Sequence, residues 1–273
     1  MMIDGGAIAE KILLGLKNQP KPKKFFAAVL VGDDPASISF LKQKEKTAAV
    51  IGIDFRLYRF PSDIKNDELR EEVGKIVHHK TCGGLIVQLP LPQHLNQHYI
   101  LNAVPAEKDV DVLSERALGA FCVGRSQVLP PAVGTIEEIL KSQNVSPREK
   151  CVAVVGVGLL VGRPVLMWFT GSLPAAFHPA EVIALRSGSD LALLKGADLV
   201  VTGVGEVGLV KPSMLKHGAA VIDFGYDQGK GDLDDQLPAT SYQQLAFYTP
   251  TPGGTGPILV AKVLENFCRL NQE

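Results

Sequence analysis

The chain has 273 residues, of which 46% are hydrophobic and 21% charged, and its formal net charge at pH 7 is −1. This length can bury one large core or two modest ones. A charge so close to zero favours neither nucleic acid nor an anionic membrane as a partner. The longest apolar runs, such as Phe25 to Val31, fall far short of the roughly 20 residues that a membrane helix needs. We therefore expect no nucleic-acid partner and no membrane span.

The cysteines and the N-terminus indicate a cytoplasmic protein. Met1-Met2-Ile3-Asp4 has no basic region leading into an apolar one, so no secretory signal is expected. The four cysteines are widely scattered without metal-ligand spacing, and we interpret them as free thiols in a reducing compartment. The six histidines show no ligand spacing either. No metal site is predicted.

Apolar runs alternate with helical periods along the chain, which is typical of α/β proteins with parallel sheets. In the first half we expect strands over Phe25–Val31, Ile53–Phe60 and Gly84–Leu89. Between them we expect one helix over Pro35–Ile51 and a second that begins at Asp67. In the second half we expect a connecting helix from Val133 or Thr135 to Gln143, strands over Cys151–Val155, Val182–Leu185, Asp198–Thr202, Ala219–Asp223 and Phe247–Tyr248, and a final helix over Leu259–Leu270.

This order of elements predicts two α/β domains with a cleft between them. Residues 1–120, together with a C-terminal helix within 255–273, form the expected catalytic domain. Residues 121–254 form the expected Rossmann-like, dinucleotide-binding domain, since a glycine turn follows its first strand. A nucleotide-binding domain beside a cleft is typical of a two-domain oxidoreductase.

Lys44 is the first candidate for chemistry. On a helix it shares a face with Phe40, while Leu41 and Ala48 define a neighbouring apolar face that can pack. Burial, and the charges of nearby Lys42 and Lys46, would lower the pKa of its amine towards neutrality, as proton exchange requires. The alternative is a surface lysine lying over its own helix.

Polar residues after the third strand are the next candidates. Gln88 ends the apolar run and could hold a lysine amine, or it could simply cap the strand. Asp109 and Asp111 can point the same way in an extended loop, where one carboxylate could hold the edge of a heterocycle by two parallel hydrogen bonds. The alternative for this pair is a solvated acidic turn.

Glycine turns in the second half predict a dinucleotide site. The first lies between a strand and an expected helix start at Arg163-Pro164, where backbone amides can approach a pyrophosphate. No acid closes the next strand, and a cation follows it instead, which favours NADP, with NAD as the alternative. The candidate cofactor-binding residues are Gly156, Val157, Gly158, Arg186, Ser187, Gly203 and Gly205.

A rigid, glycine-rich segment, Pro250-Thr251-Pro252-Gly253-Gly254-Thr255-Gly256-Pro257, precedes the last helix. Its amide groups could bind substrate or the nicotinamide end of a cofactor. The alternative is a structural turn leading into the helix.

Taken in order, these segments resemble the bifunctional methylenetetrahydrofolate dehydrogenase/methenyltetrahydrofolate cyclohydrolase family. The motifs that carry the resemblance are Val31-Gly32-Asp33-Asp34-Pro35-Ala36-Ser37, Val87-Gln88-Leu89-Pro90-Leu91-Pro92, Lys108-Asp109-Val110-Asp111 and Pro252-Gly253-Gly254-Thr255-Gly256-Pro257. The resemblance extends over nearly the whole chain, from Ile3 to Asn266.

The resemblance implies a role for each candidate residue. Lys44 matches the lysine that transfers protons in the cyclohydrolase step, Gln88 the glutamine that orients it, and Asp111 the aspartate that holds the pterin ring. Implied substrate-binding residues are Phe40, Gln88, Leu89, Asp111, Pro252, Gly253 and Gly254. The implied activities are oxidation of 5,10-methylenetetrahydrofolate with NADP and hydrolysis to 10-formyltetrahydrofolate, within one-carbon metabolism and in a homodimer.

Several positions depart from the family pattern. Phe40 stands where the family usually has a tyrosine, and Val112-Leu113-Ser114 replaces Gly-Phe-His. Because Phe40 lacks the tyrosine hydroxyl, one alternative is a dehydrogenase with weak or lost cyclohydrolase activity. The other is a folate- or nucleotide-binding paralogue without turnover, against which Lys44, Gln88 and Asp111 together argue.

Overall fold

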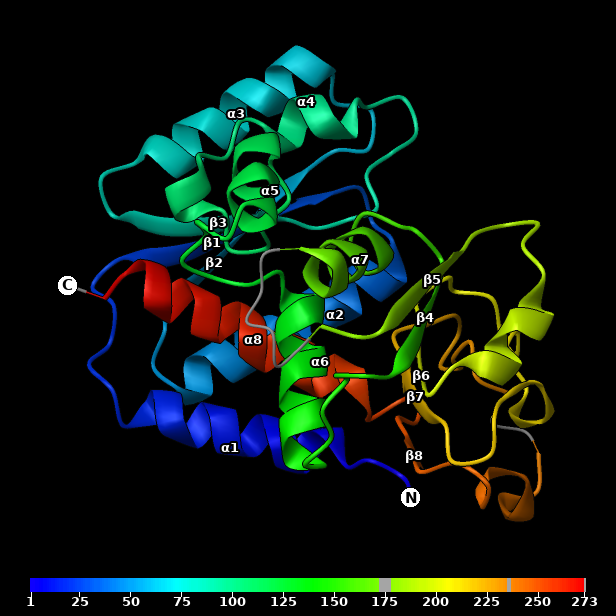
Figure 1. Ribbon diagram of the computed structural model, residues 1–273. Helices are drawn as coiled ribbons and strands as arrows, with labels where there is room; N and C mark the ends of the chain where they lie inside the picture. Colours follow the sequence, from blue (N-terminus) through cyan, green and yellow to red (C-terminus); the bar gives the residue numbers. More distant parts are fainter. Residues whose placement is uncertain (172–177, 235–236, 273) are drawn as a thin grey trace. The chain divides into compact units, whose positions relative to one another are not determined.

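The structure, a computed structural model, describes residues 1–171, 178–234 and 237–272 (Figure 1). Contacts divide the chain into two compact units. The three-stranded unit comprises Lys11–Pro131 and Val260–Glu273, and the five-stranded unit comprises Met1–Glu10 and Ala132–Leu259. The predicted class, two α/β domains with parallel sheets, is confirmed.

The three-stranded unit is built on a parallel sheet in the order β2-β1-β3. Its strands are β1 (Phe25–Val31), β2 (Phe55–Phe60) and β3 (Cys82–Val87). β1 contains no polar residue and is buried along its whole length, as expected for a central strand that is covered on both faces.

Helices cover both faces of this sheet. Figure 1 shows α3 and α5 on the opposite side of the strands from α2 and α8. Alternate β1 residues, including Phe26, belong to the core on the α2 and α8 side, and Phe26 stacks on Phe267 of α8 with ring centroids 4.8 Å apart. The helices are α2 (Pro35–Val50), α3 (Asn66–His78), α4 (Gln97–Leu101), the 3₁₀ helix η1 (Ala106–Lys108) and α5 (Glu115–Cys122).

Two helices have at least five residues in each unit, because a unit boundary falls well inside them. They are α1 (Gly5–Lys17) and α8 (Thr255–Leu270). α8 begins four residues before the expected Leu259, inside the glycine-rich segment. This is possible because Pro257 lies in the first helical turn, where a missing backbone N–H costs nothing.

The five-stranded unit contains a parallel sheet in the order β5-β4-β6-β7-β8. Its strands are β4 (Cys151–Val155), β5 (Glu181–Leu185), β6 (Leu199–Thr202), β7 (Ala220–Asp223) and β8 (Phe247–Tyr248). The strand order reverses at β4, because β5 lies on one side of it and β6 on the other. Open α/β sheets bind ligands outside the carboxyl ends of the strands at such a switch point.

Helices α6 (Pro131–Ser142) and α7 (Gly162–Thr170) lie alongside this sheet (Figure 1). A second apolar core, which includes Val155, Val200 and Val221, involves three short 3₁₀ helices and their flanking loops. These helices are η3 (Leu191–Gly196), η4 (Pro212–Met214) and η5 (Ala239–Tyr242). Among the described residues, no helix combines the length and apolar character needed to cross a bilayer.

The first residues of the chain pair with β8 at the edge of the five-stranded sheet. Met2 forms a parallel bridge with Tyr248, and Ile3 N donates to Tyr248 O at 2.9 Å. Residues 1–10 therefore group with the five-stranded unit by contacts. The contact-based units differ from the expected ranges here and at residues 121–131 and 255–259, and the expected domain boundaries stay a prediction.

Candidate active site

Lys44 lies on the buried face of α2. The side chains that share this face are spaced by three or four residues along the helix: Ser37, Leu41, Lys44 and Ala48. Asp34 caps the helix by accepting from Ser37 N at 2.8 Å, which fixes where the helix begins. Only 4% of Lys44 is exposed. The alternative of a surface lysine is therefore wrong.

Gln88 meets Lys44 at the carboxyl end of β3. Lys44 Nζ donates to Gln88 Oε1 at 3.2 Å, while Gln88 Nε2 donates to Leu89 O at 2.8 Å. The second bond fixes which amide atom faces the lysine. The Phe40 ring completes this side, with its centroid 4.7 Å from Lys44 Nζ. One helix and one strand end thus place an ammonium, an amide and an aromatic face together.

Asp111 is the charged partner of Lys44. Burial lowers the pKa of the Lys44 amine, and the Asp111 carboxylate opposes this change. Burial in turn raises the pKa of Asp111, and the lysine opposes that change. Lys42 and Lys46 were expected to contribute, but both are exposed, and side chains two positions apart on a helix do not face each other.

Asp109 has a different task from Asp111. It is 4% exposed, and its Oδ2 accepts from Leu113 N at 3.0 Å and from Ser114 N at 2.7 Å. Burial, together with the Asp111 charge, raises its pKa to about 6 against the opposing effect of the Ser114 bonds. The alternative of a solvated acidic turn is therefore wrong for Asp109, which closes a tight loop instead.

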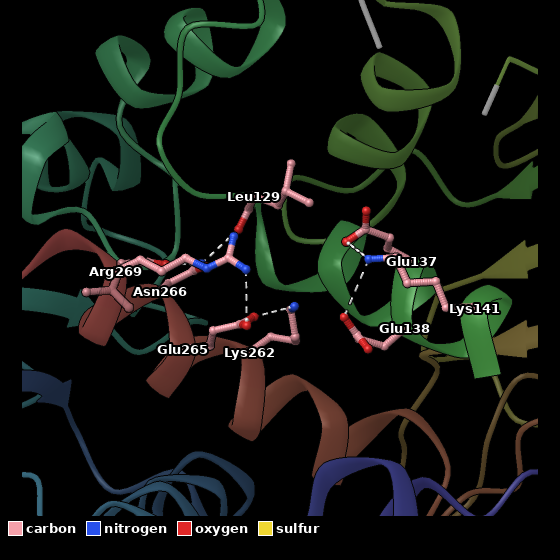
Figure 2. A network of polar contacts seen from close by, with 9 residues as sticks. Leu129, Glu137, Glu138, Lys141, Lys262, Glu265, Asn266 and Arg269 are labelled. Atoms are coloured by element: carbon pink, nitrogen blue, oxygen red, sulfur yellow. Dashed lines mark hydrogen bonds and ion pairs between the residues drawn. The ribbon is translucent and has the colours of Figure 1, made fainter. Parts of the chain in front are cut away.

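This loop contains a strained residue and is held in place by α8. Val112, which stands where the family has glycine, adopts a left-handed φ of 58°, a conformation that is costly for a β-branched residue. The buried Asn266 of α8 donates through Nδ2 to Val110 O at 3.0 Å and to Leu129 O at 2.7 Å. Figure 2 shows Asn266 beside the charged residues of α8 and reaching Leu129. Asp111 thus lies on a segment that is held by the Asp109 hydrogen bonds and by Asn266 of α8.

The two predicted glycine turns lie next to each other at the switch point of the five-stranded sheet. Gly156 follows β4 with a φ of 86°, and a Cβ there would meet Val204 Cγ2 at 2.9 Å and Gly203 O at 3.1 Å. A Cβ on Gly162, at the start of α7, would meet Gly156 O at 1.8 Å. Gly158 has open space where a Cβ would project. The turn therefore combines tight packing with a backbone that a ligand can approach.

Cationic and hydroxyl groups flank the first glycine turn. Arg186 and Ser187 follow β5 and are exposed. Arg163, in the first turn of α7, is also exposed, and its Nε donates to Val157 O at 3.3 Å. The helix N-terminus and these groups suit a phosphate-bearing ligand.

The glycine-rich segment before α8 is held by its surroundings in the five-stranded unit. Gly253 O accepts from Gly5 N at 3.1 Å. Thr255 Oγ1 donates to Asp223 O at 2.8 Å, at the end of β7. Gly253 has a φ of 95° and open space where a Cβ would project. The segment is a fixed turn and also has an accessible backbone. Both the ligand-binding interpretation and that of a structural turn before the helix therefore retain support.

The predicted site residues thus form two sets. The three-stranded unit contains Phe40, Lys44, Gln88, Leu89 and Asp111. All of these except Leu89 belong to one cluster around the Lys44 amine. The remaining ones lie in the five-stranded unit: Gly156, Val157, Gly158, Arg186, Ser187, Gly203, Gly205, Pro252, Gly253 and Gly254. The sequence did not single out two buried aspartates there, Asp223 and Asp232. Asp232 directly follows Gly231, whereas Asp223 ends an apolar run and has no glycine beside it.

The fold and the glycine turns define a dinucleotide-binding α/β protein with a second α/β domain that carries a buried lysine. Residues 3–111 match the catalytic domain of the tetrahydrofolate dehydrogenase/cyclohydrolase family, and residues 130–273 match its NAD(P)-binding domain. The chain belongs to this family.

Known proteins agree with this assignment over most of the chain. The bifunctional protein FolD of Geobacillus thermodenitrificans is 35% identical over 88% of this chain and 84% of its own. The crystal structure of FolD from Campylobacter jejuni has a TM-score of 0.89 at 30% identity, covering 99% of this chain and 98% of that one. The Trypanosoma brucei enzyme, complexed with NADP cofactor and inhibitor, also reaches 0.89, at 27% identity, covering 99% and 96%.

Proposed function

We propose that this protein oxidises 5,10-methylenetetrahydrofolate to 5,10-methenyltetrahydrofolate with NADP and hydrolyses the product to 10-formyltetrahydrofolate. Family membership over both domains supports this assignment. The observation that carries it is the buried Lys44 amine, which is hydrogen-bonded to Gln88 and interacts electrostatically with Asp111. A module that only bound folate would have no need of a lysine with a lowered pKa.

In the hydrolytic step, Lys44 serves as the base. Its neutral amine accepts a proton from the water that adds to the methenyl carbon and delivers it to the ring nitrogen that leaves when the C–N bond breaks. The hydroxyl proton of the adduct is released to solvent as the formyl C=O forms. Burial favours the neutral amine, so this step needs no stronger base near neutral pH. Gln88 Oε1 holds the amine in place, because Gln88 Nε2 is itself fixed on Leu89 O.

The same cluster supplies the substrate contacts that the family resemblance implies. Asp111 can accept two parallel hydrogen bonds from the amino-pyrimidinone edge of the pterin. Phe40 offers an aromatic face but no hydroxyl, so stacking is retained and one hydrogen bond is lost. Leu89 and the segment Pro252-Gly253-Gly254 are the remaining proposed contacts. We keep residues 1–120 with 255–273 as the proposed folate-binding domain and 121–254 as the cofactor domain.

The residues at the switch point fit a dinucleotide. Gly156, Val157 and Gly158 would hold the pyrophosphate at the start of α7, and Gly203 and Gly205 lie on the adjoining turn. Arg186 and Ser187 would receive the 2′-phosphate of NADP, since no acid follows β5 to hold a free ribose. When bound, the cofactor accepts the hydride that leaves the methylene carbon.

An absorbance assay tests the proposal. The protein is mixed with methylenetetrahydrofolate and either NADP or NAD, and methenyltetrahydrofolate is followed over time. We expect the methenyl signal to appear and then decay, faster with NADP than with NAD. A signal that appears and persists at its uncatalysed decay rate would indicate a dehydrogenase alone, and no signal with either cofactor would overturn the proposal.

We further propose a cytoplasmic homodimer. The location is supported by the scattered cysteines, which have no metal-ligand spacing, and the dimer by the family resemblance alone. Light scattering after size-exclusion chromatography tests the dimer. A mass of twice 29.3 kDa is expected, and a monomer at micromolar concentration would contradict it.

A further inference from the structure

Four hydrogen-bond donors converge on the carboxylate of Asp232, which is fully buried in the five-stranded unit. Oδ2 accepts from Thr202 Oγ1 at 2.6 Å and from Val204 N at 2.7 Å. Oδ1 accepts from Gly205 N at 2.8 Å and from Glu206 N at 2.9 Å. The interior can hold this buried carboxylate because each of its oxygens accepts two hydrogen bonds.

Thr202 is the last residue of β6, and the other three donors belong to the turn that follows this strand at the switch point. Three successive backbone N–H groups, those of Val204, Gly205 and Glu206, point inward at Asp232. Such a concave row of N–H groups is a typical site for an anion. Here the anion is a side chain of the protein itself, so these N–H groups are not available to a phosphate.

The 203–206 turn packs against the glycine turn that follows β4. A Cβ on Gly203 would meet the side chain of Val161 at 3.1 Å, and one on Gly156 would meet Val204 and Gly203. Val204 is 45% exposed at this place. Any movement of the turn would therefore displace groups that contact the first glycine turn.

We propose that Asp232 is a positioning residue for the cofactor site. Its carboxylate acts as an internal anion that shapes the 203–206 turn, which then contacts the cofactor through Val204 and its backbone surface, while the pyrophosphate depends on the Gly156–Gly162 turn. This inference rests on the proposed function. An amide cannot replace the carboxylate, because its NH₂ group would face two of the four donors.

The test compares Asp232→Asn with Asp227→Asn, a matched carboxylate-to-amide change on the exposed part of the same loop. NADP affinity is measured by equilibrium titration, and both activities are assayed. For Asp232→Asn we expect the Kd and KM for NADP to rise about tenfold or more. Hydrolysis of methenyltetrahydrofolate needs no cofactor and should stay within about twofold. Asp227→Asn should match the parent protein in every assay.

Two results would overturn the inference. One is an Asp232→Asn protein that binds NADP as tightly as the parent, and the other is an equal fall of both activities, which would indicate a general structural role. If Asp232→Asn fails to fold, Thr202→Val and Thr202→Ser decide: valine should weaken NADP binding and serine should restore it, and equal affinity would contradict the proposal.

The titration also separates this inference from the proposed function. If the parent protein binds NADP but turns over no folate, the proposed function fails, and the effect of Asp232→Asn on binding still decides the present inference. If the parent binds neither NADP nor NAD, there is no cofactor site to position and the inference is overturned.

Discussion

Lys44 illustrates how a few contacts can prepare a residue for chemistry. Burial lowers the pKa of its amine, whereas Asp111 stabilises the ammonium form and limits that change. Gln88 accepts a hydrogen bond from the amine. The cluster therefore balances two needs, a base that is available and a charge that the interior can tolerate.

This balance predicts a pH effect. Replacing Asp111 by asparagine removes the negative charge that favours protonated Lys44, so the pKa of the amine should fall further. The rising limb of the pH profile for methenyltetrahydrofolate hydrolysis should then move to lower pH. The KM for folate should rise about tenfold or more, because a charged hydrogen-bond acceptor is lost. A rising limb that stays in place, measured at saturating substrate, would contradict the pairing.

Asp109 gives a second residue-scale prediction, on stability. Its pKa is raised to about 6 in the folded protein from an ordinary value of 3.8. Its stabilising contribution is therefore complete below pH 3.8 and is lost as the pH rises through about 6. The gap corresponds to roughly 3 kcal/mol. Urea unfolding of Asp109→Asn should show the variant gaining stability relative to the parent between pH 4 and pH 8.

The asparagine can retain the loop bonds, since Leu113 N and Ser114 N both donate to the same oxygen. The informative quantity is thus the slope with pH rather than the absolute difference. A constant difference between the two proteins across this range would indicate that Asp109 does not change protonation on unfolding.

At the scale of elements, the start of α1 packs against the glycine-rich segment. A Cβ on Gly5 would lie 1.7 Å from Gly254 O, whereas one on Gly15, exposed in the last turn of the same helix, would meet nothing within 4 Å. Gly5→Ala should therefore lower the free energy of unfolding by about 1–3 kcal/mol and raise the KM for folate. Gly15→Ala should raise the free energy of unfolding by about 0.5–1 kcal/mol.

Urea denaturation and steady-state kinetics of the two variants provide the measurement. Because both substitutions add the same methyl group to the same helix, the difference between them reports the packing at Gly254. Equal stability of the two variants would contradict the close approach.

Most strands could be predicted from the sequence, because buried parallel strands are continuous apolar runs. β1 has the expected bounds, but β2 begins at Phe55 rather than Ile53. Ile53 N donates to Ala48 O and so completes the turn after α2 instead. β3 ends at Val87, and Gln88 is left outside the strand. Such turns depend on hydrogen bonds between segments, which apolar periodicity does not report.

At the scale of the whole molecule, the chain divides its chemistry between two α/β units. The lysine cluster belongs to the three-stranded unit and the glycine turns to the five-stranded unit. Sequence motifs predicted both sets, because each set contains unusual residue types in short motifs: a lysine beside an apolar helix face, polar residues after a strand, and glycine turns. The buried carboxylates of Asp109 and Asp232 could not be assigned in this way. Their roles arise from backbone N–H groups, those of the same loop for Asp109 and those of the turn after β6 for Asp232, and backbone groups carry no side-chain signature.

The central claim is that the Lys44 amine is the base for hydrolysis. Its most direct test is the rate of methenyltetrahydrofolate hydrolysis by Lys44→Met, compared with the parent protein at equal folate occupancy. Methionine has similar length but no amine, so we expect hydrolysis to fall about a hundredfold or more while folate binding is retained. A Lys44→Met protein that hydrolyses methenyltetrahydrofolate at the parent rate would contradict the account.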